Sequence, residues 1–205
     1  MIAVVDYGLG NIKAFCNVLA DLGAKYIVAK TASDLERADK IILPGGGSFD
    51  FAMAQLNRSG MRDTLDKLIL VDSKLILGVC VGMQIMANQS EEGEAQGLGW
   101  VDANVRKFDS VANGRMKIPH MGWNDVSVTR QNPILNSGDI SRFYFIHSYH
   151  FEPRSEKACI GSTSYGANFC AAINVKNIFG VQFHPEKSHH SGRILLKKFV
   201  ELSEC

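Results

Sequence analysis

The chain has 205 residues, of which 46% are hydrophobic and 21% are charged. A chain of this length and composition can build a hydrophobic core, so we expect one folded domain over residues 1–205 and no extended disorder. Lysine and arginine total 22 against 21 acidic residues, and this balance gives no electrostatic reason to expect a nucleic acid or a membrane as a partner.

The start of the chain and its cysteines indicate a cytoplasmic location. Met1 leads into IAVVD without the basic segment of an export signal. No apolar run reaches the length of a membrane span. Cysteines without a C-x-x-C pair, in a chain that lacks an export signal, are expected to be free thiols. The five cysteines are Cys16, Cys80, Cys159, Cys170 and Cys205.

The first half of the chain alternates short apolar runs with helical patterns. Apolar side chains recur at helical spacing in residues 11–23, and Gly23 is a natural end for that helix. Ser48 is the predicted N-cap of a helix over residues 49–56. Strands separated by helices indicate a parallel sheet with helices on its faces. The predicted strands are residues 2–7, 25–29, 40–43 and 74–79, and a further helix is predicted over residues 80–89.

The second half of the chain has a different sequence pattern. From about residue 97, β-rich runs are separated by Gly, Asn, Ser and Pro, as is typical of strands joined by turns. The chain closes with a predicted helix over residues 191–204, in which Leu195, Phe199 and Leu202 share one face. We therefore expect an α/β fold in which helices flank a mostly parallel central sheet that carries an antiparallel extension.

Cys80 stands where a predicted strand meets a predicted helix. It is flanked by Gly78 and Gly82 in the segment LGVCVGMQ. This is the spacing of a nucleophile elbow with cysteine in place of serine, in which glycines relieve the crowding around a sharp, strained turn. The positive end of a helix also favours the reactive thiolate. Cys80 is therefore the candidate nucleophile, and the alternative is a buried core cysteine.

A cysteine nucleophile needs a general base, and the base needs a group that orients it. The segment VQFHPEKS places His184 and Glu186 two residues apart after an apolar run. If the chain stays extended through Pro185, both side chains lie on one side and the carboxylate can hold the imidazole. A metal site that adds His189 and His190 is the alternative, but no Cys or Asp spacing completes a zinc set, so no metal is expected.

The segment PGGG, residues 44–47, follows a predicted strand and raises the question of what requires so bare a backbone. Acyl transfer needs two backbone N–H donors for the oxyanion, one from the residue after the nucleophile, here Val81, and one from a neighbouring loop. Gly46 and Gly47 are candidates for the second donor. A phosphate-binding loop is the alternative, but its lysine is absent. The glycines of DYGLGNIK do not complete a dinucleotide-binding pattern, so no cofactor is expected.

Together these motifs resemble those of the class I (triad) glutamine amidotransferases. PGGG, GVCVGMQ and VQFHPE occur in that family's order, and the resemblance covers nearly the whole chain. DYGLGN, IPHMGWN and FYFIHSY further resemble the glutaminase subunits of imidazole glycerol phosphate synthase, an enzyme of histidine biosynthesis. The resemblance implies that family's fold and the hydrolysis of glutamine to glutamate and ammonia through a cysteine thioester.

The resemblance also implies roles for particular residues. Cys80 would attack the side-chain amide of glutamine. His184, oriented by Glu186, would protonate the departing ammonia and then activate water. The expected oxyanion hole comprises Gly46, Gly47 and Val81, and the expected glutamine-binding residues are Gln84, His147, Ser148 and Tyr149.

A partner is implied as well. Relatives of this kind dock on a cyclase subunit built as a (β/α)₈ barrel, form a heterodimer with it and pass ammonia through it. The resemblance further implies that the glutaminase is nearly silent until the partner binds its acceptor, which is a coupling between two sites. Relatives usually carry a larger residue, often valine, at the position of Gly46. We expect this glycine to loosen the loop that completes the oxyanion hole.

Three other interpretations stay open at the level of sequence. The resemblance extends to paralogues that feed ammonia to a sugar-amidating synthetase in surface-polysaccharide biosynthesis. The triad does not separate the two acceptors, because its chemistry ends with ammonia. A cysteine hydrolase acting on small esters or peptides is a second alternative. A catalytically inactive binding module on the same fold is a third, although no triad position is lost.

Overall fold

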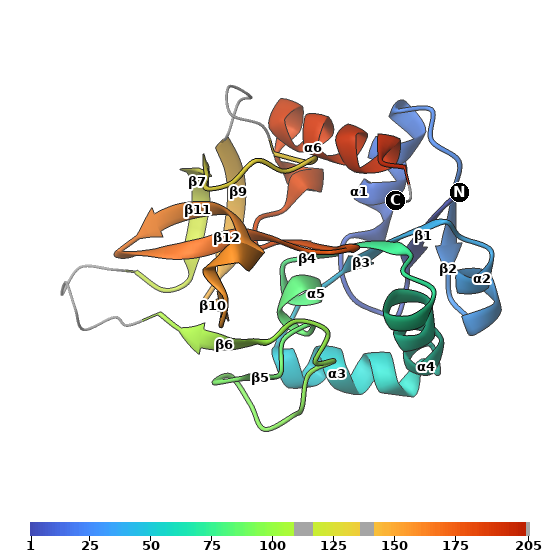
Figure 1. Ribbon diagram of the computed structural model, residues 1–205, viewed down its shortest axis with the longest axis horizontal. Helices are drawn as coiled ribbons and strands as arrows, with labels where there is room; N and C mark the ends of the chain where they lie inside the picture. The colour runs from blue at the N-terminus through green and yellow to red at the C-terminus, as the bar shows by residue number, and fades with distance from the viewer. Residues whose placement is uncertain (109–116, 136–141, 204–205) are drawn as a thin grey trace.

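The computed structural model describes residues 1–108, 117–135 and 142–203. Among these residues, eleven strands form one sheet and two more form a separate antiparallel pair (Figure 1). The large sheet follows the order β2-β1-β3-β4-β13-β12-β10-β6-β5, and β11 and β8 extend from β12. The pairs from β2 to β13 are parallel, and those from β13 to β6 are antiparallel. The predicted α/β fold, a mostly parallel central sheet with an antiparallel extension, is confirmed.

The parallel strands are apolar because helices cover both faces of this part of the sheet. Every residue of β1, β4 and β13 is buried. Pro44 pairs in register with Val79, and Val79 pairs with Val181, so the carboxyl ends of β3, β4 and β13 meet at one edge. Ligands bind at this edge in open α/β sheets. The parallel strands are β1 (Ile2–Val5), β2 (Tyr26–Ala29), β3 (Lys40–Pro44), β4 (Leu75–Val79) and β13 (Ile178–Val181).

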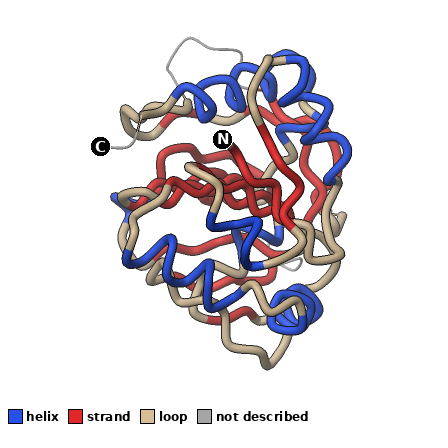
Figure 2. Tube along the Cα trace, turned by 90° about the vertical axis from the view of Figure 1, so that its right-hand side faces the viewer, coloured by secondary structure: helices blue, strands red, loops and turns tan. Residues whose placement is uncertain are grey.

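Helices pack on both faces of the parallel part (Figures 1 and 2). In Figure 1, α1 and α6 lie above the sheet, and α3, α4 (Arg62–Asp66) and α5 (Val81–Gln84) lie below it. Phe15 and Leu19 of α1 are buried, as the helical spacing predicts. Ser48 caps α3 as predicted, because its hydroxyl accepts a hydrogen bond from the Phe51 N–H at 3.4 Å. The longer helices are α1 (Ile12–Asp21), α3 (Phe49–Arg58) and α6 (His189–Glu201).

The antiparallel part carries the separate pair β7 (His120–Asp125) and β9 (Arg142–His147) at its side. Side chains alternate along this pair, so Phe143 and Phe145 are buried while Met121 and Trp123 are partly exposed on the other face. The remaining strands are β5 (Gln89–Ser90), β6 (Ala103–Lys107), β8 (Ser127–Val128), β10 (Tyr149–Pro153), β11 (Cys159–Tyr165) and β12 (Ala167–Val175).

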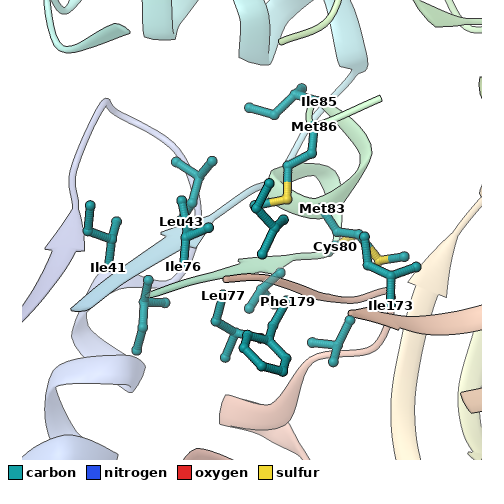
Figure 3. Close-up of a cluster of buried hydrophobic side chains, with 14 of the residues drawn as sticks. Ile41, Leu43, Ile76, Leu77, Cys80, Met83, Ile85, Met86, Ile173 and Phe179 are labelled. Carbon is teal, nitrogen blue, oxygen red and sulfur yellow. The ribbon is translucent and has the colours of Figure 1, made fainter. Parts of the chain in front are cut away.

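The core is packed tightly around β4. Figure 3 shows Leu43 and Met86 on one side of the sheet and Leu77 and Phe179 on the other. All four side chains are buried, and burying each large apolar side chain contributes roughly 1.5–3 kcal/mol. The strand end that carries Cys80 therefore rests on a rigid base.

The helix predicted over residues 80–89 is wrong in length, because α5 spans only Val81–Gln84. Just beyond it, the Ile85 carbonyl accepts a hydrogen bond from the Leu98 N–H at 2.7 Å. The returning segment thus occupies an acceptor that a longer helix would use for its own ladder.

Three helical elements of five residues were not predicted. Each is barely more than one turn, so no apolar periodicity can be read from it. A local signal was present at Thr31, which forms a capping box with Asp34. The closing helix begins and ends earlier than predicted, and residue 204 lies outside the described residues. The unpredicted elements are α2 (Ala32–Glu36), α4 (Arg62–Asp66) and the π-helical turn η1 (Lys67–Val71).

The structure bears on the state of the cysteines and on whether a helix could cross a membrane. Cys16, Cys80, Cys159 and Cys170 are free thiols, as predicted, and Cys205 lies outside the described residues. In the described part of the chain, no helix is both long and apolar enough to cross a membrane.

Candidate active site

Cys80 lies on a sharp turn between β4 and α5. Its φ of 55° and ψ of −116° are strained for a residue other than glycine. The turn is held because the Cys80 N–H donates to the Val181 carbonyl at 2.8 Å. A Cβ at Gly82 would lie 2.0 Å from the Leu43 carbonyl oxygen, and one at Gly78 would lie 2.8 Å from the Gly82 carbonyl oxygen. The backbone geometry of a nucleophile elbow is therefore present, and it requires the flanking glycines.

The glycine loop after β3 packs directly on this turn. A Cβ at Gly45 would lie 1.9 Å from the Gly82 nitrogen, so the two backbones can approach only without side chains. Gly47 has a φ of 75°, which favours glycine. At Gly46, in contrast, the nearest atom to a Cβ would be the Gly10 nitrogen at 3.7 Å. Gly45 and Gly47 therefore have steric reasons to be glycine, whereas Gly46 has room for a side chain.

His184 follows β13 at the same edge of the sheet. Its Nδ1 lies 2.9 Å from Oε1 of Glu186, whose side chain is 1% exposed. Because the carboxylate only accepts, Nδ1 carries the hydrogen and Nε2 is the free nitrogen. His184 Nε2 is buried and has no hydrogen-bond partner among the described residues. This nitrogen is therefore available for chemistry.

The surroundings of His184 favour its protonated form. Burial works against a charge on the ring, but the interactions with Cys80 and Glu186 outweigh it and raise the pKa of His184 to about 10. A protonated imidazole beside a thiol stabilises the thiolate and can donate a proton to a leaving group.

The chain does not stay extended through Pro185, because residues Pro185–Lys187 form a 3₁₀ turn, η3. Proline suits the first position of a helical turn, where its fixed φ is already helical. The Ser188 hydroxyl closes the turn by donating to the His184 carbonyl at 2.6 Å. The turn brings Glu186 back to the imidazole, so the predicted contact forms by a different local path.

A cavity of about 320 Å³ joins these groups. Glu186 is not among the residues that line it and contacts the ring of His184 at Nδ1. Every other predicted site residue lines this one space. The predicted lining residues are Gly46, Gly47, Cys80, Val81, Gln84, His147, Ser148, Tyr149 and His184, and the unpredicted ones are Glu92, Pro119 and Ile146.

The unpredicted lining residues reach the cavity by contacts that are distant in sequence. Glu92 is fixed because its Oε2 accepts a hydrogen bond from the Phe49 N–H at 2.8 Å. The Ile146 carbonyl lies 3.8 Å from Cys80 Sγ. Pro119 and Ile146 fall within the quoted segments IPHMGWN and FYFIHSY, which could have identified them, whereas no local pattern marks Glu92.

A buried pair of amides adjoins the nucleophile. Gln84 Nε2 donates to the Tyr149 carbonyl at 2.9 Å and to Gln182 Oε1 at 3.0 Å. Gln182 Nε2 in turn lies 3.8 Å from Cys80 Sγ. Because both hydrogens of the Gln84 amide are used, its side-chain oxygen is the atom left to meet a ligand. Gln182, which is fully buried, was not predicted.

The ring of His147 is fully engaged within the protein. Nδ1 lies 2.8 Å from the Tyr149 carbonyl, and Nε2 lies 3.0 Å from Nδ1 of His120. Burial lowers the pKa of His147 to about 3. A contribution of His147 to ligand binding would therefore come from its backbone or from how it positions its neighbours.

The metal alternative receives no support from this geometry. Within the described ranges, no group of three His, Cys, Asp or Glu side chains is placed to hold a metal ion. His189 stacks on Trp123, with ring centroids 5.3 Å apart, and is not directed to a site shared with His184.

Comparison with known proteins gives full-length matches. The chain is 48% identical to the imidazole glycerol phosphate synthase subunit HisH of Leptospira interrogans and 49% identical to that of Bdellovibrio bacteriovorus. It is 45% identical to subunit HisH 2 of Pseudomonas aeruginosa. Each comparison covers 98% of this chain and 100% of the relative.

Solved structures show which fold the chain shares, and a family model shows which family it matches. A crystal structure of a glutamine amidotransferase is 20% identical, with a TM-score of 0.74 over 98% of this chain and 97% of its own. The structure of PurLQS from Thermotoga maritima is also 20% identical, with a TM-score of 0.75 over 97% and 96%. These two establish a common fold. The model for glutamine amidotransferase class-I matches residues 3–202, and the chain therefore belongs to the class I glutamine amidotransferases.

Proposed function

We propose that this chain hydrolyses the side-chain amide of glutamine as the glutaminase subunit of an imidazole glycerol phosphate synthase in histidine biosynthesis. The observation that carries the proposal is that Cys80 and the His184–Glu186 pair meet at one cavity beside the glycine loop. The full-length relatives support the assignment to this synthase.

The first half of the reaction forms a thioester. Cys80 Sγ attacks the side-chain carbonyl carbon of glutamine, and the carbonyl oxygen takes up negative charge. The N–H of Val81 and one from Gly46 or Gly47 donate to this oxygen, and each such donor stabilises the transition state by roughly 2.7–4 kcal/mol. His184 Nε2 gives its proton to the amide nitrogen as the C–N bond breaks, and ammonia leaves.

The second half releases glutamate. Water attacks the thioester carbon while His184 Nε2 takes its proton, and the C–S bond then breaks to restore the Cys80 thiolate. Glu186 holds Nδ1 throughout, so the same nitrogen first donates a proton and then accepts one.

The cavity offers groups for both ends of an amino acid. The Glu92 carboxylate and the side-chain oxygen of Gln84 are acceptors suited to the α-ammonium group. The Ser148 hydroxyl and the backbone near Tyr149 are the corresponding groups for the α-carboxylate. A volume of about 320 Å³ suits a small ligand of this kind.

An apolar face beside the cavity suits a partner. Met121, Trp123 and Ile146 project from β7 and β9 and are 58%, 41% and 36% exposed. Ile146 also lines the cavity, so a partner docked here would cover its mouth. Ammonia is mostly protonated in neutral water and must be shielded from it to stay nucleophilic. The partner is a cyclase subunit, a (β/α)₈ barrel that forms a heterodimer with this chain, receives the ammonia and activates the glutaminase.

A sugar as the acceptor of the ammonia is not favoured. The relatives compared above all carry the name of the imidazole glycerol phosphate synthase subunit, and none is named for sugar amidation. An inactive binding module is also disfavoured, because Cys80, His184 and Glu186 all keep their places around the cavity.

The test of the glutaminase is a Cys80→Ala variant, assayed as glutamate release in complex with the cyclase. Release is expected to fall to the background level. Cys16→Ala is the matched control, because Cys16 is a free thiol on α1 that does not line the cavity. Full turnover in Cys80→Ala, with circular dichroism unchanged, would overturn the proposed chemistry.

The test of the acceptor is genetic. A histidine auxotroph that lacks its own glutaminase subunit should grow without histidine when it expresses this chain together with its cognate cyclase. Failure of a well-expressed, folded protein would redirect the ammonia to another acceptor, while leaving glutamine hydrolysis itself intact.

A further inference from the structure

A line of hydrogen bonds runs from β7 to the cavity through His120, a buried residue that does not itself line the cavity. Asn124 Nδ2 lies 3.2 Å from His120 Nε2, and His120 Nδ1 lies 3.0 Å from His147 Nε2. His147 Nδ1 lies 2.8 Å from the Tyr149 carbonyl oxygen. Both rings are therefore bonded at both nitrogens.

Only one placement of the hydrogens satisfies every link. The Tyr149 carbonyl can only accept, so His147 Nδ1 carries a hydrogen and His147 Nε2 accepts. His120 Nδ1 must then donate, and its Nε2 accepts from the Asn124 amide. This placement leaves both rings neutral, in agreement with burial, which lowers the pKa of His120 to about 4 and that of His147 to about 3.

The line ends at atoms that the proposed reaction uses. The Tyr149 carbonyl that accepts from His147 also accepts from Gln84, and both residues line the cavity. The amide of Gln84 continues to Gln182, which adjoins Cys80 Sγ. The orientation of His147 is therefore coupled to the cavity wall between Gln84 and Tyr149.

His120 is also held rigidly by its neighbours. Its ring stacks on Tyr165 with centroids 4.0 Å apart and on Phe145 with centroids 4.7 Å apart. The ring therefore has little freedom to rotate, and its Nδ1 is fixed in the direction of His147. A side chain that only filled this space could be aromatic without a nitrogen.

We propose that His120 is a positioning residue for glutamine binding: it holds His147 as the Nδ1–H tautomer, so that Ser148 and Tyr149 keep the orientation that binds the substrate. His120 acts through His147 and does not touch glutamine. The inference rests on the proposed glutaminase function, and it adds a residue to that function which lies outside the cavity.

Two substitutions separate the hydrogen bond from simple space filling. His120→Phe keeps an aromatic ring between Tyr165 and Phe145 but removes the donor to His147. His120→Asn loses ring area but keeps an N–H close to the position of Nδ1. In the complex with the cyclase, we expect His120→Phe to raise the KM for glutamine about tenfold with kcat changed less than about threefold. His120→Asn should restore KM to within about threefold of the unmodified chain.

The tautomer itself provides a readout that does not depend on activity. ¹⁵N NMR of the histidine rings should show His147 protonated at Nδ1 in the unmodified chain and in His120→Asn, but not uniformly so in His120→Phe. An Nε2–H tautomer of His147 in the unmodified chain would overturn the proposal even if the phenylalanine variant failed to fold. Equal KM values in both variants would overturn it as well.

The proposed glutaminase function and the proposed role of His120 can be tested separately. If the unmodified complex does not release glutamate, the proposed function fails, whatever the tautomer is. If the complex is active and the KM of His120→Phe stays within about twofold of the unmodified value, only the role of His120 fails.

Discussion

The parallel part of the molecule contributes closely packed backbone to the cavity, and the antiparallel part contributes hydrogen-bonded polar side chains. The parallel part supplies Cys80 and the glycine loop, whose backbones pack so closely that a Cβ at Gly45 would lie 1.9 Å from Gly82. The antiparallel part supplies the segment around His147, which is fixed by hydrogen bonds between buried polar groups. His184 stands at the junction, after the last parallel strand. In the proposed reaction, the placement of the nucleophile and the oxyanion donors would therefore depend on backbone packing, whereas the binding of glutamine would depend on hydrogen bonds between buried side chains.

The largest expected effect is at the junction. Glu186→Gln removes the charge that helps to raise the pKa of His184. We expect kcat to fall on the order of a hundredfold, with little change in KM, because general acid–base catalysis is worth about 10²–10⁴-fold. His184 would also lose its proton at a lower pH, so activity should decline earlier as pH rises.

Steady-state glutamate release across pH in the cyclase complex measures both effects. Glu152→Gln is the control, because Glu152 is exposed on β10, pairs with Arg106 and does not line the cavity. A change in KM alone for Glu186→Gln would place this residue in binding and break the proposed division.

A pair of neighbouring glycines tests the role of backbone packing. Gly45→Ala should destabilise the protein by about 2–3 kcal/mol, since its Cβ meets backbone that cannot move aside. Gly46→Ala should cost less than about 0.5 kcal/mol, because its Cβ finds no atom closer than 3.7 Å. Urea denaturation measures both, and equal losses would show that the close approach is not what fixes the loop.

A smaller effect is expected on glutaminase activity in the absence of the cyclase, which depends on the resting conformation of the glycine loop. Gly46→Val should lower glutaminase activity in the absence of the cyclase by about threefold, because a β-branched residue restricts the backbone that a bare glycine leaves free. A Cβ at Gly46 would meet no atom closer than 3.7 Å, so we expect the variant to fold. Glutamate release by the isolated chain is the measurement. Equal or higher activity in Gly46→Val would show that this residue does not set the resting state.

The smallest effect concerns acid stability of the antiparallel part. His120 and His147 stay neutral in the folded chain down to pKa values of about 4 and about 3, against 6.5 for an unperturbed histidine. The unfolded chain therefore binds more protons below about pH 6.5, and stability should fall as pH is lowered from there towards 4. In His120→Phe the unfolding free energy should depend less steeply on pH. The difference in slope should correspond to up to about one bound proton.

Urea denaturation between pH 7 and pH 4 measures the slope. His150 and His184 are the other titratable side chains that interact with His147, and both remain in the variant. An unchanged slope would mean that His120 is not buried as a neutral ring.

Features carried by local pattern could be predicted from the sequence. The Gly78-Cys80-Gly82 spacing predicted the elbow, and the pairing of His184 with Glu186 was predicted because only Pro185 separates them in the sequence. The alternation of strands and helices gave the parallel sheet. The same reasoning could not distinguish Gly45 from Gly46, because the distinction depends on which glycine meets Gly82 in the folded chain.

Features carried by tertiary contacts could not be predicted. Glu92 reaches the cavity through a hydrogen bond to Phe49, 43 residues away. His120 and His147 meet only because β7 and β9 pair in register, and the segment between these strands gives no sign of it. Buried amides such as Gln182 carry no motif of their own beyond the residues that flank them.

Glutamine is proposed to react at Cys80. The most direct test is to incubate the cyclase complex with an electrophilic diazoketone analogue of glutamine and to locate the adduct by peptide mass spectrometry. We expect one adduct, on Cys80, that excess glutamine prevents, with Cys16, Cys159 and Cys170 unmodified. Labelling of another cysteine, or inactivation that leaves Cys80 unlabelled, would contradict the assignment of Cys80 as the nucleophile.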